Sequence, residues 1–169
     1  RRGRMVSRAA IETELADRFA KRNIPYLFGS FNAGGLEAAD VDLFADLFAN
    51  FPVNYHAYLP PDKTSINSED GFYVLRPFTV WAPALWKLKK TMRGLFVGEC
   101  GTFKPWRDMG LGAGDAARIC QAINAELAGI CYAHSVPYHG ACAYGIGLQG
   151  REAKWNLNDG MVELVGTGT

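Results

Sequence analysis

The chain of 169 residues is poor in several features that would point to particular classes of protein. Its four cysteines form no Cys-x-x-Cys pair, which argues against a zinc or thioredoxin-like motif and a disulfide framework. No apolar run approaches the roughly 20 residues of a membrane helix, and no signal peptide is recognised at the first residues. The formal net charge is only +1, so neither nucleic acid nor a membrane is expected as a partner.

The rest of the composition is that of one globular domain. Hydrophobic residues make up 49% of the chain and charged residues 21%, which is ordinary for a protein with a packed core. The length suits a single domain over 1–169. Because the first residue is Arg rather than Met, the start of the protein and its cellular compartment are left open.

Helical and extended patterns alternate along the chain, which predicts an α/β fold. Apolar residues at helical spacing predict helices that begin near Ser7, Asp40, Pro83 and Asp115, the last of which is expected to end at Gly129. Apolar runs predict strands over 24–31, 53–59, 95–100 and 130–136. Consecutive strands are separated by one helix each, and right-handed crossovers would make them parallel.

Polar residues gather where the predicted strands end. The strand-to-helix loops of a parallel sheet share one rim, and ligands bind there in open α/β sheets and in (β/α)8 barrels. The expected rim residues are Asn32, His56, Tyr58, Glu99 and His134. Glu99 follows the apolar run 95–97 and is bracketed by two glycines. This placement favours an acid presented at the mouth of a sheet, with a solvated loop acid as the alternative.

Three separated segments resemble the cellulase-type glycoside hydrolases of clan A, which are (β/α)8 barrels. LFVGECG at 95–101 is similar to the strand that carries the nucleophile of that clan, and NYHAY at 54–58 resembles the strand before it. KWNLNDGMVEL at 154–164 resembles the segment after the final strand. The resemblance implies a partial barrel made of strands five to eight, the C-terminal part of a larger catalytic domain, with Glu99 as the nucleophile.

The chain departs from the clan in ways that make a fragment the simplest interpretation. The acid/base glutamate of the clan follows an Asn, and these 169 residues contain no Asn-Glu dipeptide. The Arg that the clan supplies from an early strand has no counterpart, and His134 stands where the clan usually has Trp. We therefore expect the proton donor to lie outside this chain, with Glu37, Glu69 and Asp70 as substitutes on the rim.

The expected activity is retaining hydrolysis of an O-glycosyl bond in a polysaccharide or oligosaccharide. Such enzymes need two carboxyl groups about 5 to 5.5 Å apart, and aromatic side chains that stack on sugars. The substrate-binding residues are expected to be Asn32, His56, Tyr58, Trp106, His134 and Tyr138. No cofactor or metal is expected, the partner is carbohydrate, and open outer strands predict self-association.

Two other classes of function remain open. A metal-dependent α/β enzyme would use His56, Glu99, His134 and His139 as ligands, since imidazole and carboxylate suit several divalent metals. A non-catalytic carbohydrate-binding protein would keep the rim and lack turnover. A nucleophilic Cys100 is disfavoured, because strand alternation points it away from Glu99.

Overall fold

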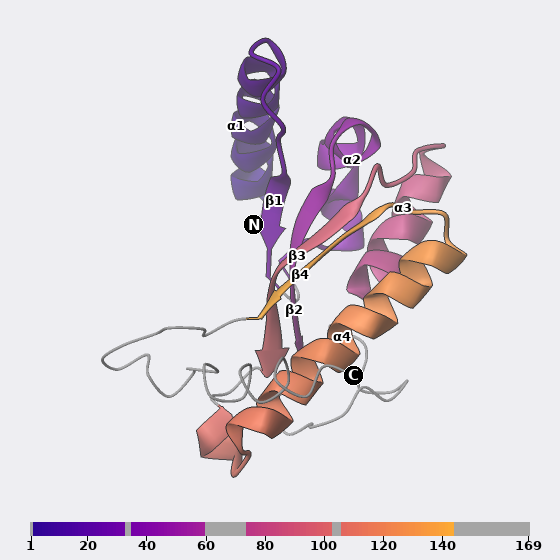
Figure 1. The fold of residues 1–169 in the computed structure, drawn as a ribbon. Coiled ribbons are helices and arrows are strands. Elements are labelled where there is room, and N and C mark those ends of the chain that lie inside the picture. The colour runs from indigo at the N-terminus through magenta and orange to yellow at the C-terminus, as the bar shows by residue number, and fades with distance from the viewer. Residues whose placement is uncertain (1, 33–34, 60–73, 103–105, 144–169) are drawn as a thin grey trace.

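The structure is a computed structural model that describes residues 2–32, 35–59, 74–102 and 106–143 (Figure 1). Its elements, in chain order, are α1 (Arg2–Ala20), β1 (Phe28–Phe31), the 3-10 helix η1 (Ala38–Phe44), α2 (Ala45–Asn50), β2 (Val53–Leu59), the π-helical turn η2 (Pro77–Trp81), α3 (Ala82–Lys87), β3 (Leu95–Thr102), the 3-10 helix η3 (Trp106–Met109), α4 (Ala113–Ala133) and β4 (Tyr138–Ala143). The clan-like segment 154–164 and the candidate acids Glu69 and Asp70 lie outside the described residues.

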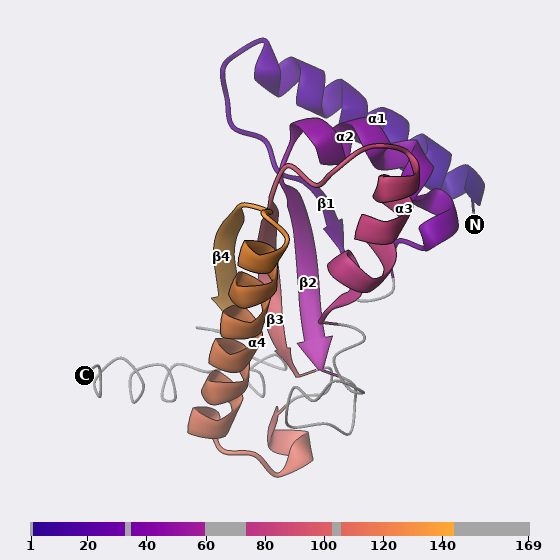
Figure 2. The same ribbon diagram turned by 90° about the vertical axis from the view of Figure 1, so that its right-hand side faces the viewer.

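The four strands form one all-parallel sheet in the order β1-β2-β3-β4. Figure 2 shows the four arrows pointing the same way, with α3 and α4 packed in front of the sheet. Each strand is followed along the chain by helical structure before the next strand begins. The prediction of an α/β fold with parallel βα units is therefore confirmed.

The core lies between one face of the sheet and the helices. Residues of β2 alternate between buried and half-buried positions, with Val53, Tyr55, Ala57 and Leu59 on the buried side. Trp81 is fully buried at the centre, and its ring lies 5.1 Å from that of Tyr55 in an edge-to-face contact. Such a contact contributes about 0.5–1.5 kcal/mol beyond the burial of area. The indole N–H of Trp81 donates to the carbonyl of Leu36 at 3.1 Å, so its burial leaves no donor unpaired.

The last helix and strand differ from the prediction. The helix α4 continues through Gly129 to Ala133, and the strand β4 covers Tyr138–Ala143, so the strand expected over 130–136 is wrong. The helix ends in a Schellman turn, in which the N–H of Val136 donates to the carbonyl of Cys131 at 2.8 Å. Ser135 takes the left-handed conformation of that turn, with φ of 54°. Gly129 therefore marks no helix end.

Other boundaries move by smaller amounts. The helix α1 begins at Arg2, five residues before the cap expected at Ser7, and β1 is confined to Phe28–Phe31. Asp40 lies inside η1 rather than before an α-helix. Trp86, whose position beside a helix start suggests a core residue, is 79% exposed on the short helix α3.

The outer strands of the described sheet are β1 and β4. The helix α1 lies beside β1, and the Arg8 guanidinium donates to the carbonyl oxygens of Gly29 and Ser30. Self-association through these strands stays a prediction. None of the described helices combines the length and the apolar character needed to cross a membrane.

Candidate functional site

Polar side chains line the face of the sheet opposite the one covered by α2, α3 and α4. Asn54, His56 and Tyr58 occupy alternate positions of β2 and are half-buried, while their neighbours on that strand face the core. Glu99 joins them from β3, with 34% of its side chain exposed. We call these four residues the polar face.

Glu99 lies on the polar face because Gly98 forms a bulge in β3. Val97 pairs with Tyr55 and Glu99 pairs with His56, so Gly98 has no partner in the β2–β3 ladder. Strict alternation would otherwise place Glu99 on the same side as the buried Val97. The Gly98 N–H donates to Oδ1 of Asn54 at 2.9 Å. A Cβ on Gly98 would collide with that same amide group, so any larger residue at position 98 would displace the Asn54 side chain.

Two side chains of β2 contact the same oxygen of Glu99. The Tyr58 hydroxyl donates a short hydrogen bond to Oε2, and Nδ1 of His56 lies 3.3 Å from it. A hydrogen bond to a charged group is worth about 1.5–3 kcal/mol, and the Tyr58 bond together with the His56 contact fixes the direction of the carboxylate. Of the four residues expected to converge on one cleft at the carboxyl ends of the strands (His56, Tyr58, Glu99 and His134), the first three contact one another, and His56 and Glu99 lie within β2 and β3 rather than at their ends.

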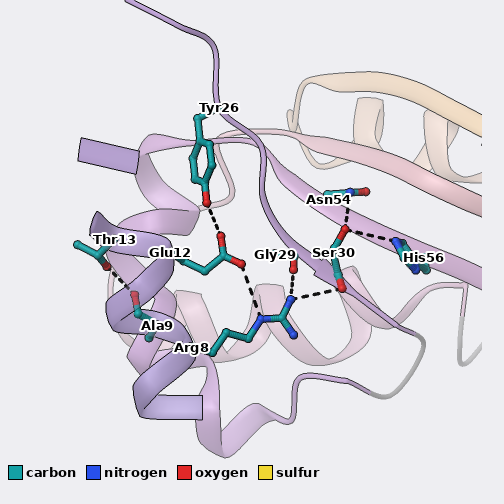
Figure 3. Close-up of polar contacts among 9 residues, drawn as sticks. All are labelled: Arg8, Ala9, Glu12, Thr13, Tyr26, Gly29, Ser30, Asn54 and His56. Carbon is teal, nitrogen blue, oxygen red and sulfur yellow. Dashed lines mark hydrogen bonds and ion pairs between the residues drawn. The ribbon is translucent and has the colours of Figure 1, made fainter. Parts of the chain in front are cut away.

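Ser30 and Asn54 extend the contacts around His56, and neither was predicted from the sequence as a site residue. Nδ2 of Asn54 donates to the Ser30 hydroxyl at 2.9 Å, and that hydroxyl lies 3.5 Å from Nε2 of His56 (Figure 3). The i, i+2 spacing of Asn54 with His56 is a signal that was present in the sequence. Ser30 carried no such signal, because it is an extra residue in β1, between the pairs Gly29–Asn54 and Phe31–Tyr55.

The backbone around Ser30 is held in an uncommon conformation. Gly29 has φ of 104°, and a Cβ there would lie 2.7 Å from the Phe31 ring. Ser30 itself has φ of 54°, a conformation that costs a non-glycine residue about 1–3 kcal/mol. Arg8 offsets this strain by binding both carbonyls and by placing its guanidinium carbon 4.5 Å from the centre of the Phe31 ring. Glu12 in turn lies 3.7 Å from Arg8.

The remaining predicted residues divide between the two ends of the sheet. Asn32 directly follows β1 and is exposed, and Trp106 begins η3 after β3, so both follow the carboxyl ends of strands. His134 caps the C-terminus of α4, with its ring 5.0 Å from that of Phe78. It precedes β4, which means that its predicted place on the rim is wrong.

Tyr138 also lies at the other end. It is the first residue of β4, it pairs with Leu95 at the start of β3, and its hydroxyl donates to Oδ1 of Asn124 at 2.9 Å. Burial raises the pKa of this phenol. The expectation that Tyr138 follows the last strand as a rim residue is therefore wrong, for the same reason as for His134.

The four ligands of the metal alternative are not brought together. His139 is the second residue of β4, and its imidazole lies beside Gly94, which precedes β3. His134 and His139 therefore lie toward the starts of β3 and β4, whereas His56 and Glu99 pair with each other farther along β2 and β3. Within residues 2–32, 35–59, 74–102 and 106–143, no three His, Cys, Asp or Glu side chains are grouped as metal ligands.

Two other candidates for chemistry have structural partners. Cys100 is 1% exposed on the helix-covered side of β3, where its thiol meets that of Cys120. The hydrogen bond with Cys120, together with burial, raises the pKa of the Cys100 thiol, so this cysteine is a poor nucleophile. Glu37 is ion-paired with the buried guanidinium of Arg76, at 3.1 Å.

Similarity to known proteins adds no assignment. Comparison of the chain with family models, with curated proteins and with solved structures finds no match.

Proposed function

We propose that this protein is a retaining glycoside hydrolase, or part of one, in which Glu99 is the nucleophile. The observation that carries the proposal is the double contact of one Glu99 oxygen with the Tyr58 hydroxyl and with His56. A carboxylate aimed by two neighbours, partly exposed and placed on a rigid strand, suits attack on an anomeric carbon.

The finer fold that accompanies this proposal is half of a (β/α)8 barrel, with β1 to β4 as its strands five to eight. Its support is the division of the sheet into two faces, since barrel strands direct one face to the surrounding helices and the other to the interior. In β2, apolar side chains face the helices and Asn54, His56 and Tyr58 face the opposite side. An active site at the carboxyl ends of the strands is where barrel enzymes carry their chemistry.

In the proposed reaction, an oxygen of Glu99 forms a bond to the anomeric carbon while the bond to the leaving group breaks. Water then hydrolyses the glycosyl-enzyme and restores the carboxylate. Tyr58 and His56 hold the nucleophile, and Asn32 and Trp106 are proposed to contact the sugar from the loops after β1 and β3. The proton donor is proposed to be supplied from outside the described residues.

An activated 2-fluoro glycoside tests the role of Glu99 without the need for a proton donor. Fluorine slows breakdown of the intermediate, and a fluoride leaving group departs without protonation. We expect gluco- or manno-configured 2-deoxy-2-fluoro glycosyl fluorides to leave one sugar on the protein, located by mass spectrometry in the peptide that contains Glu99. The adduct should be absent in Glu99→Gln, which keeps the shape of the side chain and cannot attack.

The matched control is Glu37→Gln, because Glu37 is an ion-paired carboxylate in the loop after β1. Labelling should persist in that variant. An adduct that survives Glu99→Gln, or that maps to Glu37, would remove Glu99 from the proposed role.

A non-catalytic carbohydrate-binding protein is the second candidate, favoured by the absence of an Asn-Glu dipeptide from the sequence. It predicts that oligosaccharides shift the intrinsic tryptophan fluorescence, while the 2-fluoro reagents leave no covalent sugar.

A further inference from the structure

The two ring nitrogens of His56 contact two different reactive groups. Nδ1 faces the Glu99 carboxylate at 3.3 Å, and Nε2 faces the Ser30 hydroxyl at 3.5 Å. Because an ionised carboxylate only accepts hydrogen bonds, the hydrogen of a neutral His56 belongs on Nδ1. The Nε2 lone pair is then directed at Ser30. Figure 3 shows the Ser30 hydroxyl pointing toward His56 and Asn54.

Asn54 determines the direction in which the Ser30 hydroxyl donates. Its Nδ2 donates to the Ser30 oxygen at 2.9 Å, so the hydroxyl accepts from Asn54 and keeps its own hydrogen for His56. The same amide receives the Gly98 N–H through Oδ1. Asn54 therefore ties the position of Ser30 to the bulge that orients Glu99.

The backbone presents Ser30 as an exposed group at the bend of a strand. Ser30 is exposed, its φ is 54°, and the preceding Gly29 also has a positive φ of 104°. Arg8 binds the carbonyls of both residues from α1. Ser30 thus lies in a strained bulge near the carboxyl end of a parallel strand, with its hydroxyl aimed at a histidine. Hydrolases of the α/β class likewise expose their nucleophile on strained backbone, there a strand-to-helix turn.

We propose that Ser30, His56 and Glu99 form a Ser-His-Glu triad that catalyses acyl transfer from carboxylic esters. The order of contacts, hydroxyl to Nε2 and carboxylate to Nδ1, is that of a nucleophile, a general base and the group that orients the base. The 3.5 Å between Ser30 and His56 is within the looser range found in unliganded sites. This activity goes beyond the proposed glycosidase function, because its nucleophile is Ser30.

The reaction balances with water as the only co-reactant. The Ser30 oxygen bonds to the ester carbonyl carbon as its proton passes to Nε2 of His56. Collapse of the tetrahedral intermediate breaks the bond from carbon to the alkoxy oxygen, and the proton goes to the leaving alcohol. Water then attacks the acyl-serine, gives a proton to His56 and releases the acid, after which the proton returns to Ser30.

The surroundings of Ser30 favour esters with a short acyl group. The described side chains that approach its hydroxyl are those of Asn54 and His56, and Tyr58 and Glu99 continue the same polar face. These groups offer hydrogen bonds rather than apolar surface to the acyl chain. The substrate class is therefore an acetyl or similarly small ester of a polar alcohol.

A fluorophosphonate with a short alkyl chain tests the nucleophile directly. Attack by Ser30 forms the oxygen–phosphorus bond, breaks the phosphorus–fluorine bond and leaves a stable adduct. We expect one phosphonyl group on the 169-residue chain, mapped to Ser30 by mass spectrometry, and hydrolysis of 4-nitrophenyl acetate that the adduct abolishes. His56→Gln should slow labelling about 100-fold, within the range of lost general-base catalysis.

Matched variants distinguish labelling of Ser30 by the triad from nonspecific reaction of the fluorophosphonate with other serines. Ser135 has the same φ of 54° at the end of α4, so Ser135→Ala should label at the rate of the unaltered chain. Ser30→Ala and Ser30→Gly should both lose the label. Ser30→Gly also relieves the backbone strain, and circular dichroism would establish that it is folded.

The proposal is overturned if the folded chain takes no label, or if the label persists in both Ser30 variants. Labelling that does not depend on His56 would equally remove the triad. The phosphonate marks Ser30, whereas the 2-fluoro sugar marks Glu99, so the failure of either proposal is visible without the other.

Discussion

The Tyr58 hydroxyl donates to the carboxylate of Glu99 across a diagonal of the sheet, because the ladder pairs Tyr58 with Gly101 and His56 with Glu99. The contact requires that Gly98 form a bulge, since a regular ladder would pair Gly98 with His56 and turn Glu99 to the side of the buried Val97. Most of the candidate chemistry of this protein therefore depends on a glycine that itself carries no functional group.

Gly98→Ala should destabilise the protein and separate Tyr58 from Glu99. The added methyl group meets the side-chain amide of Asn54, and forced overpacking of this kind costs about 1–3 kcal/mol. Urea unfolding monitored by circular dichroism gives the free energy of unfolding. A stability equal to that of the unaltered chain would contradict the geometry of the bulge.

The Asn54→Ala variant supplies the control for this experiment. Alone, it should lose about 1 kcal/mol per missing hydrogen bond. Combined with Gly98→Ala, it removes the collision, so the double variant should be more stable than the sum of the two single effects predicts. Strict additivity would mean that Gly98 and Asn54 do not contact each other.

The four thiols should react at very different rates. Cys142 is exposed in β4, whereas Cys100, Cys120 and Cys131 are buried. Burial also raises the pKa of the Cys131 thiol to about 11, which leaves little thiolate at neutral pH. A colorimetric disulfide reagent should titrate one thiol in the native protein and four in urea. Cys142→Ser should abolish the native reaction, and fast native labelling of Cys100 would contradict the described packing.

The start of α4 should lose stability in acid. Asp115 accepts hydrogen bonds from Arg118 at 2.8 Å and from the Gly112 N–H at 3.1 Å, and both lower the pKa of its carboxyl group. A group with a lowered folded pKa contributes stability above its unfolded pKa of about 4, and loses it as the pH falls through the folded value. The free energy of unfolding of Asp115→Asn should therefore fall less steeply below pH 4 than that of the unaltered chain.

The Arg118→Gln variant should show an intermediate loss of stability in acid. It removes the ion pair and keeps the hydrogen bond from Gly112, so its acid dependence should lie between those of the other two proteins. If the free energy of unfolding falls equally below pH 4 in all three proteins, Asp115 makes no contribution to the pH dependence.

Two substitutions near the end of α4 should stabilise the protein. Gly129 is exposed inside the helix with open space around its Cα, so Gly129→Ala should add about 0.5–1 kcal/mol. Ser135 holds the left-handed position of the Schellman turn, so Ser135→Gly should add a similar amount, about 0.5–1 kcal/mol. Thermal unfolding measures both, and a loss of stability in Gly129→Ala would contradict the continuous helix.

Much of the site was predictable wherever strand alternation is regular. The pattern Asn-x-His-x-Tyr places its three polar residues on one side of β2, opposite the buried Tyr55, and this much follows from a period of two. The position of Glu99 at the end of an apolar run was equally visible, and so was the separation of Cys100 from it.

The errors arise where local signals compete with tertiary packing. Gly129 predicts a helix end, yet α4 continues because Leu127 and Cys131 are both buried beneath it. That shift of one element removed His134 and Tyr138 from the rim. The left-handed helix end at Asn23 was expected, whereas those at Lys89 and Ser135 carry neither glycine nor asparagine, so composition could not locate them. Ser30 remained hidden because an extra residue in a strand has no sequence signature of its own.

The bulges beside Tyr55 have a consequence for how such a sheet evolves. In β1 and β3 the bulge residue is left out of the pairing, and the alternation of inward and outward side chains resumes after it. Loss of the single codon for Gly98 would turn the bulge into a regular ladder, in which Glu99 directly follows Val97 and stays opposite His56, and Cys100 stays on the buried side. A one-residue insertion in this sheet is thus absorbed where it occurs, and the residues beyond it keep their side of the sheet and their partners in the neighbouring strand.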